Sequence, residues 1–231
     1  MIKKQERIAK RIARAGICSR RDAERMILTG HVAVNNKILE TPACLVDEED
    51  VITIDGKKIT APSATRVWLY HKPVGLVTTA RDPQGRPTVF AALPPDMPRV
   101  ISVGRLDLNS EGLLLLTNDG EWARKMELPT SHLKRTYHVR VHGKIPDNLI
   151  EQLAKGRTIA GVRYAPCDVQ IEKKGGSNTW LIMTLEEGKN REIRRLMASF
   201  GIQVARLIRT SYGPYQLGDL KKGEIKEVTC V

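Results

Sequence analysis

The sequence predicts an α+β protein with a small N-terminal domain and a larger C-terminal domain. Strand-like patterns are mixed with a few helical patterns, and they show no regular βαβ alternation. The residue pattern changes near residue 60, where an aperiodic stretch containing Pro62 separates a charged segment from a strand-rich one. The 231 residues suffice for a small and a medium-sized domain. We therefore expect domains at residues 1–60 and 67–231, joined by a linker at residues 61–66.

The N-terminal domain is expected to contain two short helices followed by strand pairs. Apolar residues at helical spacing run up to Gly16, a residue type that commonly ends helices. Ser19 is a typical N-cap for the second helix, with Asp22 three residues later. The segment HVAV, the Asn35-Asn36 turn and KIL then predict a hairpin. A second pair, VITID and GKKI, ends the domain.

The C-terminal domain is expected to consist mainly of strands. The segments VWLYHKP and GLVTT indicate strands, and a loop containing GRLD leads into the apolar strand LLLLT. The segments TYHVRVHG and TWLIMTL indicate further strands, and the first of them alternates between two faces. IPDNLIEQLAKG predicts a helix with Pro146 near its first position and Gly156 after its end.

The charge of the chain indicates a polyanionic partner. The formal net charge is +12, and the isoelectric point is about 9.7. Residues 1–25 alone contain nine Lys or Arg residues and three acidic residues. A basic surplus of this size makes nucleic acid the first candidate. The alternative is that these cations form an ordinary solvated surface.

Cysteine spacing and hydropathy favour a protein of the cytoplasm. Cys18, Cys44, Cys167 and Cys230 form no C-x-x-C pair, so neither a structural zinc site nor a disulfide framework is expected. The N-terminus lacks a signal-peptide pattern, and the longest apolar run, at residues 113–116, is too short to span a bilayer. We expect a cytoplasmic protein without membrane contact.

The GRLD loop, residues 104–107, is the first candidate for chemistry. Asp107 stands two residues after Arg105, in a loop that leads directly into a buried strand. A strand in the core gives such a loop a rigid base, and a nearby arginine keeps a carboxylate ionised. The alternative is a surface turn in which Asp107 caps its own backbone.

A second candidate is the helix predicted after Gly188. Asn190 is a plausible N-cap, and the apolar residues Ile193, Leu196, Met197 and Phe200 follow helical spacing. At 100° per residue, the arginines of this helix lie opposite the apolar stripe: Arg191, Arg194 and Arg195. They could be solvated, hold phosphate or reach a carboxylate. His138 and His142 share a strand face but have no third ligand, so no metal is expected.

Several segments together resemble the RsuA/RluB family of bacterial ribosomal RNA pseudouridine synthases. These segments follow the family's order between residues 67 and 215: HKPVGLVTT, DPQGRPTVF, VGRLDLNSEGLLLLTNDGE, LKRTYHVRV, EGKNREIRRLM and VARLIRTSYG. The segment AKRIARAGICSRRDAERMILTGHVAVN resembles the RNA-binding domain named after ribosomal protein S-four. The resemblance implies a catalytic domain with a central mixed, largely antiparallel sheet and flanking helices.

The resemblance also implies roles for individual residues. Asp107 matches the family's catalytic aspartate, which attacks the ribose or assists formation of a glycal. Tyr137 matches the tyrosine that stacks on the target base, and its own strand pattern predicts a buried ring. Arg194 matches the arginine that pairs with the aspartate. Arg105 matches the residue that occupies the space left by the flipped nucleotide, and Leu207 or Ile208 would wall the pocket.

The implied reaction is isomerisation of a uridine to pseudouridine in ribosomal RNA, without metal or organic cofactor. GKNREIRRLM is more similar to the branch that acts on large-subunit RNA. Arg14, Arg20, Arg21 and Arg191 are expected to help bind ribosomal RNA or an assembly intermediate, and we expect a monomer. The alternatives are a non-catalytic RNA-binding ribosome-assembly factor, indifferent to Asp107, and a glycosylase that cleaves without rejoining.

Overall fold

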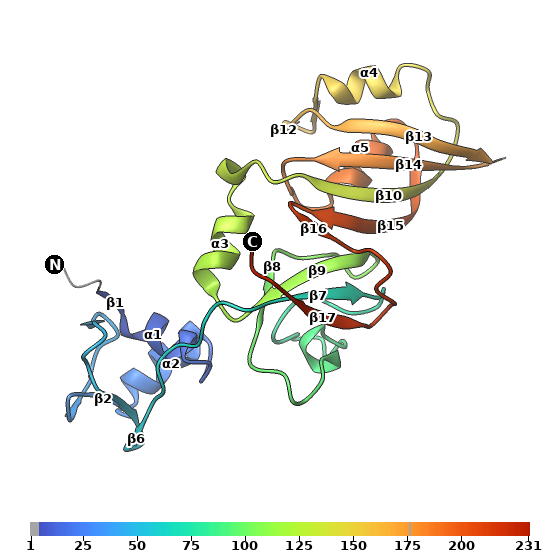
Figure 1. The fold of residues 1–231 in the computed structure, drawn as a ribbon. Helices are drawn as coiled ribbons and strands as arrows, with labels where there is room; N and C mark the ends of the chain where they lie inside the picture. The colour runs from blue at the N-terminus through green and yellow to red at the C-terminus, as the bar shows by residue number, and fades with distance from the viewer. Residues whose placement is uncertain (1–4, 176) are drawn as a thin grey trace. The chain divides into compact units, whose positions relative to one another are not determined.

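The computed structural model describes residues 5–175 and 177–231, which form two compact units (Figure 1). The first unit extends to Arg66 and also takes in Asp96–Ile101 and Asn118–Gly120. The second consists of Val67–Pro95, Ser102–Thr117 and Glu121–Val231. The first unit therefore contains two short segments that lie far along the chain. The sequence analysis expected a continuous N-terminal domain without these segments.

Two helices form the core of the first unit. Helix α1 (Ile8–Arg14) is followed by α2 (Arg20–Leu28), whose N-cap Ser19 accepts a hydrogen bond from the Asp22 N–H, as the sequence predicted. The helices bury their apolar faces against the strands, and the fully or nearly fully buried residues are Ile8, Ala9, Ile12, Ala23, Ile27, Val32, Val46 and Ile52.

The strands of this unit form one four-stranded sheet and one short pair. The sheet has the order β3-β2-β5-β6, with bounds β2 (Val32–Val34), β3 (Lys37–Ile38), β5 (Ile52–Ile54) and β6 (Lys57–Lys58). Asn35 and Asn36 both have positive φ, which is the geometry of the predicted hairpin turn. The pair β1 (Glu6–Arg7) and β4 (Leu45–Val46) was not predicted, because two residues are too short to show a pattern.

A nine-stranded sheet organises the second unit. Its main path has the order β13-β14-β10-β15-β9-β7-β17, while β16 pairs with β15 and β8 pairs with β9. The bounds are β7 (Val67–Lys72), β8 (Ile101–Val103), β9 (Glu111–Thr117), β10 (Arg135–His142), β13 (Asp168–Gly175), β14 (Asn178–Leu185), β15 (Gln203–Tyr212), β16 (Tyr215–Gln216) and β17 (Ile225–Val228). The sheet is mixed and largely antiparallel, as expected, with β15 and β9 as its parallel pair.

Gly112 permits the close approach of this parallel pair. Its φ is +105°, and a Cβ at this position would lie 2.3 Å from the carbonyl oxygen of Arg209. The two strands pair over two residue pairs, Ile208 with Glu111 and Arg209 with Gly112. The glycine that opens the leucine run is therefore required where two halves of the sheet meet.

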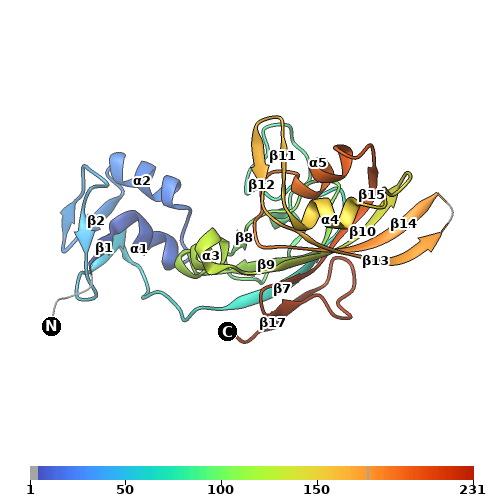
Figure 2. The ribbon, with the colours of Figure 1, turned by 90° about the horizontal axis from the view of Figure 1, so that it is seen from above.

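One face of β10, β13, β14 and β15 is covered by helices. Alternate residues of these strands pack with α4 (Leu149–Ala154) and α5 (Glu192–Ala198) into a single buried cluster. Figure 2 shows α4, α5 and the hairpin of β11 (Arg157–Ile159) and β12 (Val162–Tyr164) on the same side of the sheet. The period-two pattern seen in TYHVRVHG is the signature of this one-sided packing.

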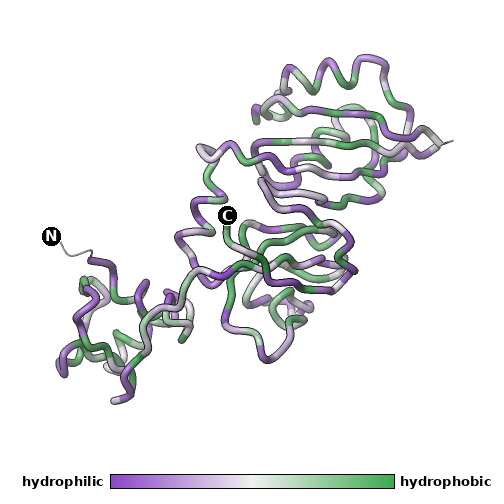
Figure 3. The backbone as a smooth tube through the Cα atoms, viewed as in Figure 1, coloured by the Kyte–Doolittle hydropathy of each residue, from purple (hydrophilic) through white to green (hydrophobic). Residues whose placement is uncertain are grey.

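Strands β7 and β9 are buried along nearly their whole length. All seven residues of β9 are buried, and five of the six in β7. Figure 3 shows the hydrophobic colouring that this run of leucines gives to the centre of the unit. No helix in the described part of the chain is long and apolar enough to cross a membrane.

Two local expectations were wrong. Residues 75–79 form no strand and make one isolated bridge, between Val77 and Thr88, and the Thr78 and Thr79 hydroxyls donate to main-chain carbonyls of loops instead. Helix α4 begins at Leu149, so Pro146 lies before it rather than in its first turn. The remaining elements are helix α3 (Gly120–Glu127) and two 3-10 turns, η1 (Phe90–Ala92) and η2 (Pro129–Ser131).

Candidate active site

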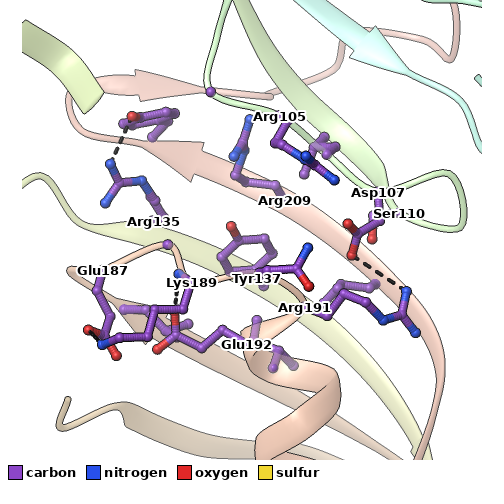
Figure 4. A pocket seen from close by; sticks show the side chains of 18 of the residues that line it. Arg105, Asp107, Ser110, Arg135, Tyr137, Glu187, Lys189, Arg191, Glu192 and Arg209 are labelled. Carbon is purple, nitrogen blue, oxygen red and sulfur yellow. Dashed lines mark hydrogen bonds and ion pairs between the residues drawn. The ribbon is translucent and has the colours of Figure 1, made fainter. Parts of the chain in front are cut away.

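A pocket of about 540 Å³ lies in the second unit, within the size range of small-molecule sites. The GRLD loop, β10, the turn before α5 and β15 supply most of its wall. Figure 4 shows Asp107 and Arg191 together at one end, Arg135 at the other, and Tyr137 and Arg209 between them. The structure therefore brings Arg105, Asp107, Tyr137, Arg191 and Leu207 to one cavity. Arg194 is not among the residues that line it.

The GRLD loop is held through its main chain. Gly104 has a φ of +66°, and its N–H donates to Glu127 Oε1 at 2.6 Å. Thr78 Oγ1 donates to the Leu106 carbonyl at 2.9 Å, and the Leu106 side chain is buried. These contacts leave the Asp107 carboxylate directed into the pocket while the backbone on either side is anchored.

Lys72 holds the GRLD loop through its main-chain carbonyls and was not predicted as a site residue. Its side chain is 0% exposed, and Nζ donates to three carbonyl oxygens: Pro73 at 2.9 Å, Asp107 at 3.2 Å and Ser110 at 2.9 Å. Burial lowers the pKa of Lys72 to about 8, against the attraction of Asp107 and Glu111. All three ammonium protons therefore serve to fix the backbone around Asp107.

Glu111 forms a second buried support four residues after Asp107. Its carboxylate is 3% exposed and pairs with Arg206 of β15 and with Lys222, whose Nζ lies 2.6 Å from Oε2. Burial acts to raise the pKa of Glu111, but the hydrogen bonds from Arg206 and Lys222 outweigh it and lower the pKa overall. This cluster ties the start of β9 to β15 and to the C-terminal segment.

The ion pair of Asp107 differs from the expected one. Arg191 Nη1 lies 3.8 Å from Asp107 Oδ2, whereas Arg194 donates to the carbonyls of Asn109 and Val204 at 2.8 and 3.0 Å. Burial lowers the pKa of Arg194, and Arg191 lowers it further, while Asp107 opposes them. Arg194 thus contributes positive charge near Asp107 and holds its loop. Arg191, for which solvation, phosphate binding and contact with a carboxylate were all left open, makes the direct contact.

A late start of the helix explains this exchange. Helix α5 begins at Glu192, so its N-cap is Arg191 with a φ of +52°, and not Asn190 as predicted. This left-handed residue turns the Arg191 side chain toward the GRLD loop (Figure 4). Asn190 Oδ1 instead accepts from Arg195 at 3.3 Å. Sequence spacing alone cannot reveal a positive φ at an arginine.

Two glutamates stabilise the turn before α5. Glu192 is 5% exposed, and its Oε2 accepts from the Lys189 N–H at 2.8 Å. Burial raises the pKa of Glu192 to about 8, and the neighbouring Glu187 adds to the effect. Glu187 pairs with Lys189 Nζ and accepts from the Ala165 N–H at 2.7 Å. The pair therefore holds one proton at neutral pH.

Tyr137 and Leu207 lie side by side on the pocket wall. Tyr137 is half-buried rather than fully buried, because its side chain packs against the helix-covered cluster and also lines the cavity. Leu207 is 6% exposed and lines the pocket. Its neighbour Ile208 belongs to the opposite face of β15, since side chains alternate along a strand. The choice left open between the two is therefore decided geometrically for Leu207.

The three N-terminal arginines lie in the first unit and differ from one another. Arg20 and Arg21 are exposed at the start of α2. Arg14 is half-buried and pairs with Glu6 at 2.9 Å, a carboxylate that also faces Lys10 and Arg11. Arg20 and Arg21 are therefore available to a polyanion, while the charge of Arg14 is partly balanced within the unit.

His138 of β10 contacts a carboxylate and an aromatic ring. His138 Nε2 contacts Glu172 Oε2 at 2.5 Å, and its ring stacks on Trp180 with centroids 4.1 Å apart. Among the described residues there is no group of three or more His, Cys, Asp or Glu side chains placed to bind a metal ion.

Comparisons with known proteins agree on the family. Residues 66–199 match the model for RNA pseudouridylate synthases, and residues 6–52 match the S4 domain. An uncharacterized RNA pseudouridine synthase of Rickettsia bellii is 53% identical over 224 residues, covering 97% of each chain. A crystal structure of a pseudouridylate synthase superposes with a TM-score of 0.69 at 26% identity, covering 96% of each chain.

More distant relatives carry a more specific name. Ribosomal large subunit pseudouridine synthase B of Xanthomonas campestris is 42% identical over 98% of this chain, and that of Pseudomonas aeruginosa is 42% identical over 96%. This chain spans 48% and 59% of those proteins, respectively. The fold, the pocket and these matches confirm the resemblance seen in the sequence: the chain belongs to the RNA pseudouridine synthase family, with an N-terminal S4 domain.

Proposed function

We propose that this protein converts a uridine of 23S, the large-subunit ribosomal RNA, to pseudouridine, with Asp107 as the catalytic nucleophile. The observation that carries the proposal is the Asp107 carboxylate in the pocket, held on a main-chain anchored loop and paired with Arg191. Two relatives named for the large subunit and the GKNREIRRLM segment support the choice of RNA.

The reaction is a redox-neutral isomerisation. The bond between uracil N1 and ribose C1′ breaks, a bond between uracil C5 and C1′ forms, the C5 proton leaves and N1 gains a proton. Asp107 would attack the ribose or assist formation of a glycal, and Arg191 would keep the carboxylate ionised. Tyr137 would stack on the extruded base beside Leu207, since an aromatic face holds an unstacked base.

Roles for the remaining predicted residues follow from their places. Arg105 would enter the space left by the flipped nucleotide, and Arg194 would steady the segment around Asn109. Arg20 and Arg21 would contact phosphates from the S4 domain, with Arg14 contributing less because Glu6 already faces it. Residues 1–60 would thus dock RNA and residues 67–231 would carry out the chemistry.

The protein is proposed to act as a monomer in the cytoplasm. Its four cysteines are unpaired, which suits a reducing compartment. Sedimentation velocity at micromolar concentration should give a single species near the 25.8 kDa of one chain. A stable dimer would refute the monomer.

The decisive experiment is tritium release from ribosomal RNA labelled at uridine C5. Wild-type protein should release tritium from unmodified 23S RNA, and Asp107→Ala should lower turnover at least about a thousandfold. RNA affinity should stay within a few-fold, because the carboxylate serves chemistry rather than docking. Asp96→Ala, an exposed carboxylate outside the pocket, is the matched control and should retain turnover.

Other results would exclude this function. Tritium release from 16S RNA alone would move the substrate to the small subunit. Absence of release from either RNA or from precursor particles would favour a non-catalytic assembly factor. Free uracil without pseudouridine would indicate a glycosylase.

A further inference from the structure

Two buried arginines face the pocket without a carboxylate partner. Arg209 is 3% exposed and Arg135 is 7% exposed, and both line the cavity. Their guanidinium carbons lie 5.1 and 4.5 Å from the centre of the Tyr212 ring. Neither makes an ion pair within the described part of the chain. Burying a cation is unfavourable unless an anion compensates it.

Arg135 donates to three acceptors within the protein, whereas Arg209 donates to one. Arg135 donates to the carbonyls of Leu133 and Glu186 and to the Tyr212 hydroxyl. Arg209 donates from Nε to the Leu113 carbonyl at 2.7 Å, while its buried Nη2 has no hydrogen-bond partner among the described residues. The Arg209 guanidinium is therefore fixed at the pocket wall by one hydrogen bond and still has an N–H donor without an acceptor among the described residues.

The nearby carboxylates are already engaged elsewhere. Glu127 accepts from the Gly104 N–H, Glu187 pairs with Lys189, and Glu192 accepts from the Lys189 N–H. None of them forms an ion pair with Arg209 in the described structure. The exposed Arg105, on the GRLD loop, adds a further cation to the same cavity. Arg209 and Arg105 are thus cations of the pocket lining for which the described structure records no ion pair.

We propose that Arg209 binds the phosphodiester group that flanks the flipped uridine. A phosphodiester is the anion that RNA carries beside every nucleotide, and a guanidinium fork matches two of its oxygens. Figure 4 shows Arg209 beside Tyr137 and away from Asp107, so the phosphate and the nucleophile would occupy different parts of the pocket. This assignment deepens the proposed function and rests on it.

The test compares two small probes on the full-length protein. Uridine 3′,5′-bisphosphate and uridine are titrated by calorimetry at low salt into wild type, Arg209→Met and Arg163→Met. Arg163 is exposed, outside the pocket, and serves as the matched control. Wild type and the control should bind the bisphosphate at least about tenfold more tightly than uridine, the effect of one charge-assisted contact. In Arg209→Met the preference should fall below about threefold.

A second variant covers the case in which methionine prevents folding. Arg209→Lys keeps a cation but loses the planar fork, so the preference should fall several-fold while the fold is kept. An undiminished preference in either folded variant would overturn the proposal, as would equal binding of the two probes by wild type. Tritium release from 23S RNA is measured on the same wild-type preparation. Bisphosphate preference without release would refute the RNA substrate and leave the phosphate site standing.

Discussion

Replacing Lys72 with methionine tests the anchoring of the GRLD loop. Lys72 is fully buried, and its ammonium donates to the carbonyls of Pro73, Asp107 and Ser110. Methionine keeps a similar length and an apolar stem but removes the charge and all three donors. We therefore expect lower stability and a displaced Asp107, with a larger effect on kcat than on KM.

The size of the stability change follows from two opposing terms. Three hydrogen bonds from a charged donor contribute on the order of 5–9 kcal/mol. Burial lowers the pKa of Lys72 from 10.5 to about 8, and this shift corresponds to about 3 kcal/mol of unfavourable burial that methionine removes. The net loss should be about 2–6 kcal/mol in the free energy of unfolding.

The pH dependence gives an independent signature. Because the pKa of Lys72 is lower in the folded state, the unfolded chain binds more protons between pH 8 and 10.5. This residue should therefore make wild type more stable as pH rises through that window, relative to a variant without the amine. Lys72→Met should lack this contribution.

Urea unfolding at pH 7 and pH 10 measures the loss of stability and its pH dependence. Tritium release at pH 7 measures the change in kcat and KM. Lys226→Met is the matched control, since Lys226 is exposed on β17 and should change stability by less than about 0.5 kcal/mol. Equal stabilities of wild type and Lys72→Met, or an unchanged kcat, would refute the anchoring argument.

Three further predictions test the supports of the pocket. Glu111→Gln should lower the free energy of unfolding by about 1–3 kcal/mol above pH 5. Because the pKa of Glu111 is lowered in the folded state, the difference from wild type should shrink as acid protonates the carboxylate, and urea unfolding at a series of pH values measures this. Gly112→Ala should lower stability by at least about 2 kcal/mol, because its Cβ would meet the Arg209 carbonyl at 2.3 Å; a change under 0.5 kcal/mol in thermal unfolding contradicts it. The double change Arg20→Ala, Arg21→Ala should reduce the salt dependence of 23S RNA binding by about 0.7 in slope per lost phosphate contact, and an unchanged slope would show that these arginines are only solvated.

Sequence patterns predicted the secondary structure correctly where the pattern depends on local packing or local capping. Alternation in TYHVRVHG predicted a strand with one covered face, and Ser19 predicted a helix start, because both patterns report local packing or local capping. Asp107 was predicted as a site residue because the whole segment around it resembles a family signature. The loop pattern alone left a surface turn open as the alternative.

The supporting residues of the site could not be predicted in this way. Lys72 and Glu111 are charged residues in strands that otherwise read as apolar, and nothing nearby in the sequence indicates their partners. Their contacts span 38 residues to Ser110 and 95 residues to Arg206. The exchange between Arg191 and Arg194 depends on a single positive φ, which arginine rarely adopts and which no sequence pattern reports.

The way the GRLD loop is anchored would allow the proposed nucleophile to react without its side chain being needed to stabilise the loop. Lys72, Thr78 and Glu127 all contact main-chain atoms of residues 104–110, and none of them uses the Asp107 side chain. Within the described residues the carboxylate makes one ion pair, with the half-exposed Arg191 at 3.8 Å. Support and chemistry are therefore separated between backbone and side chain, so Asp107→Ala should unfold at the same urea concentration as wild type. A clear loss of stability in that variant would mean that the carboxylate itself holds the loop.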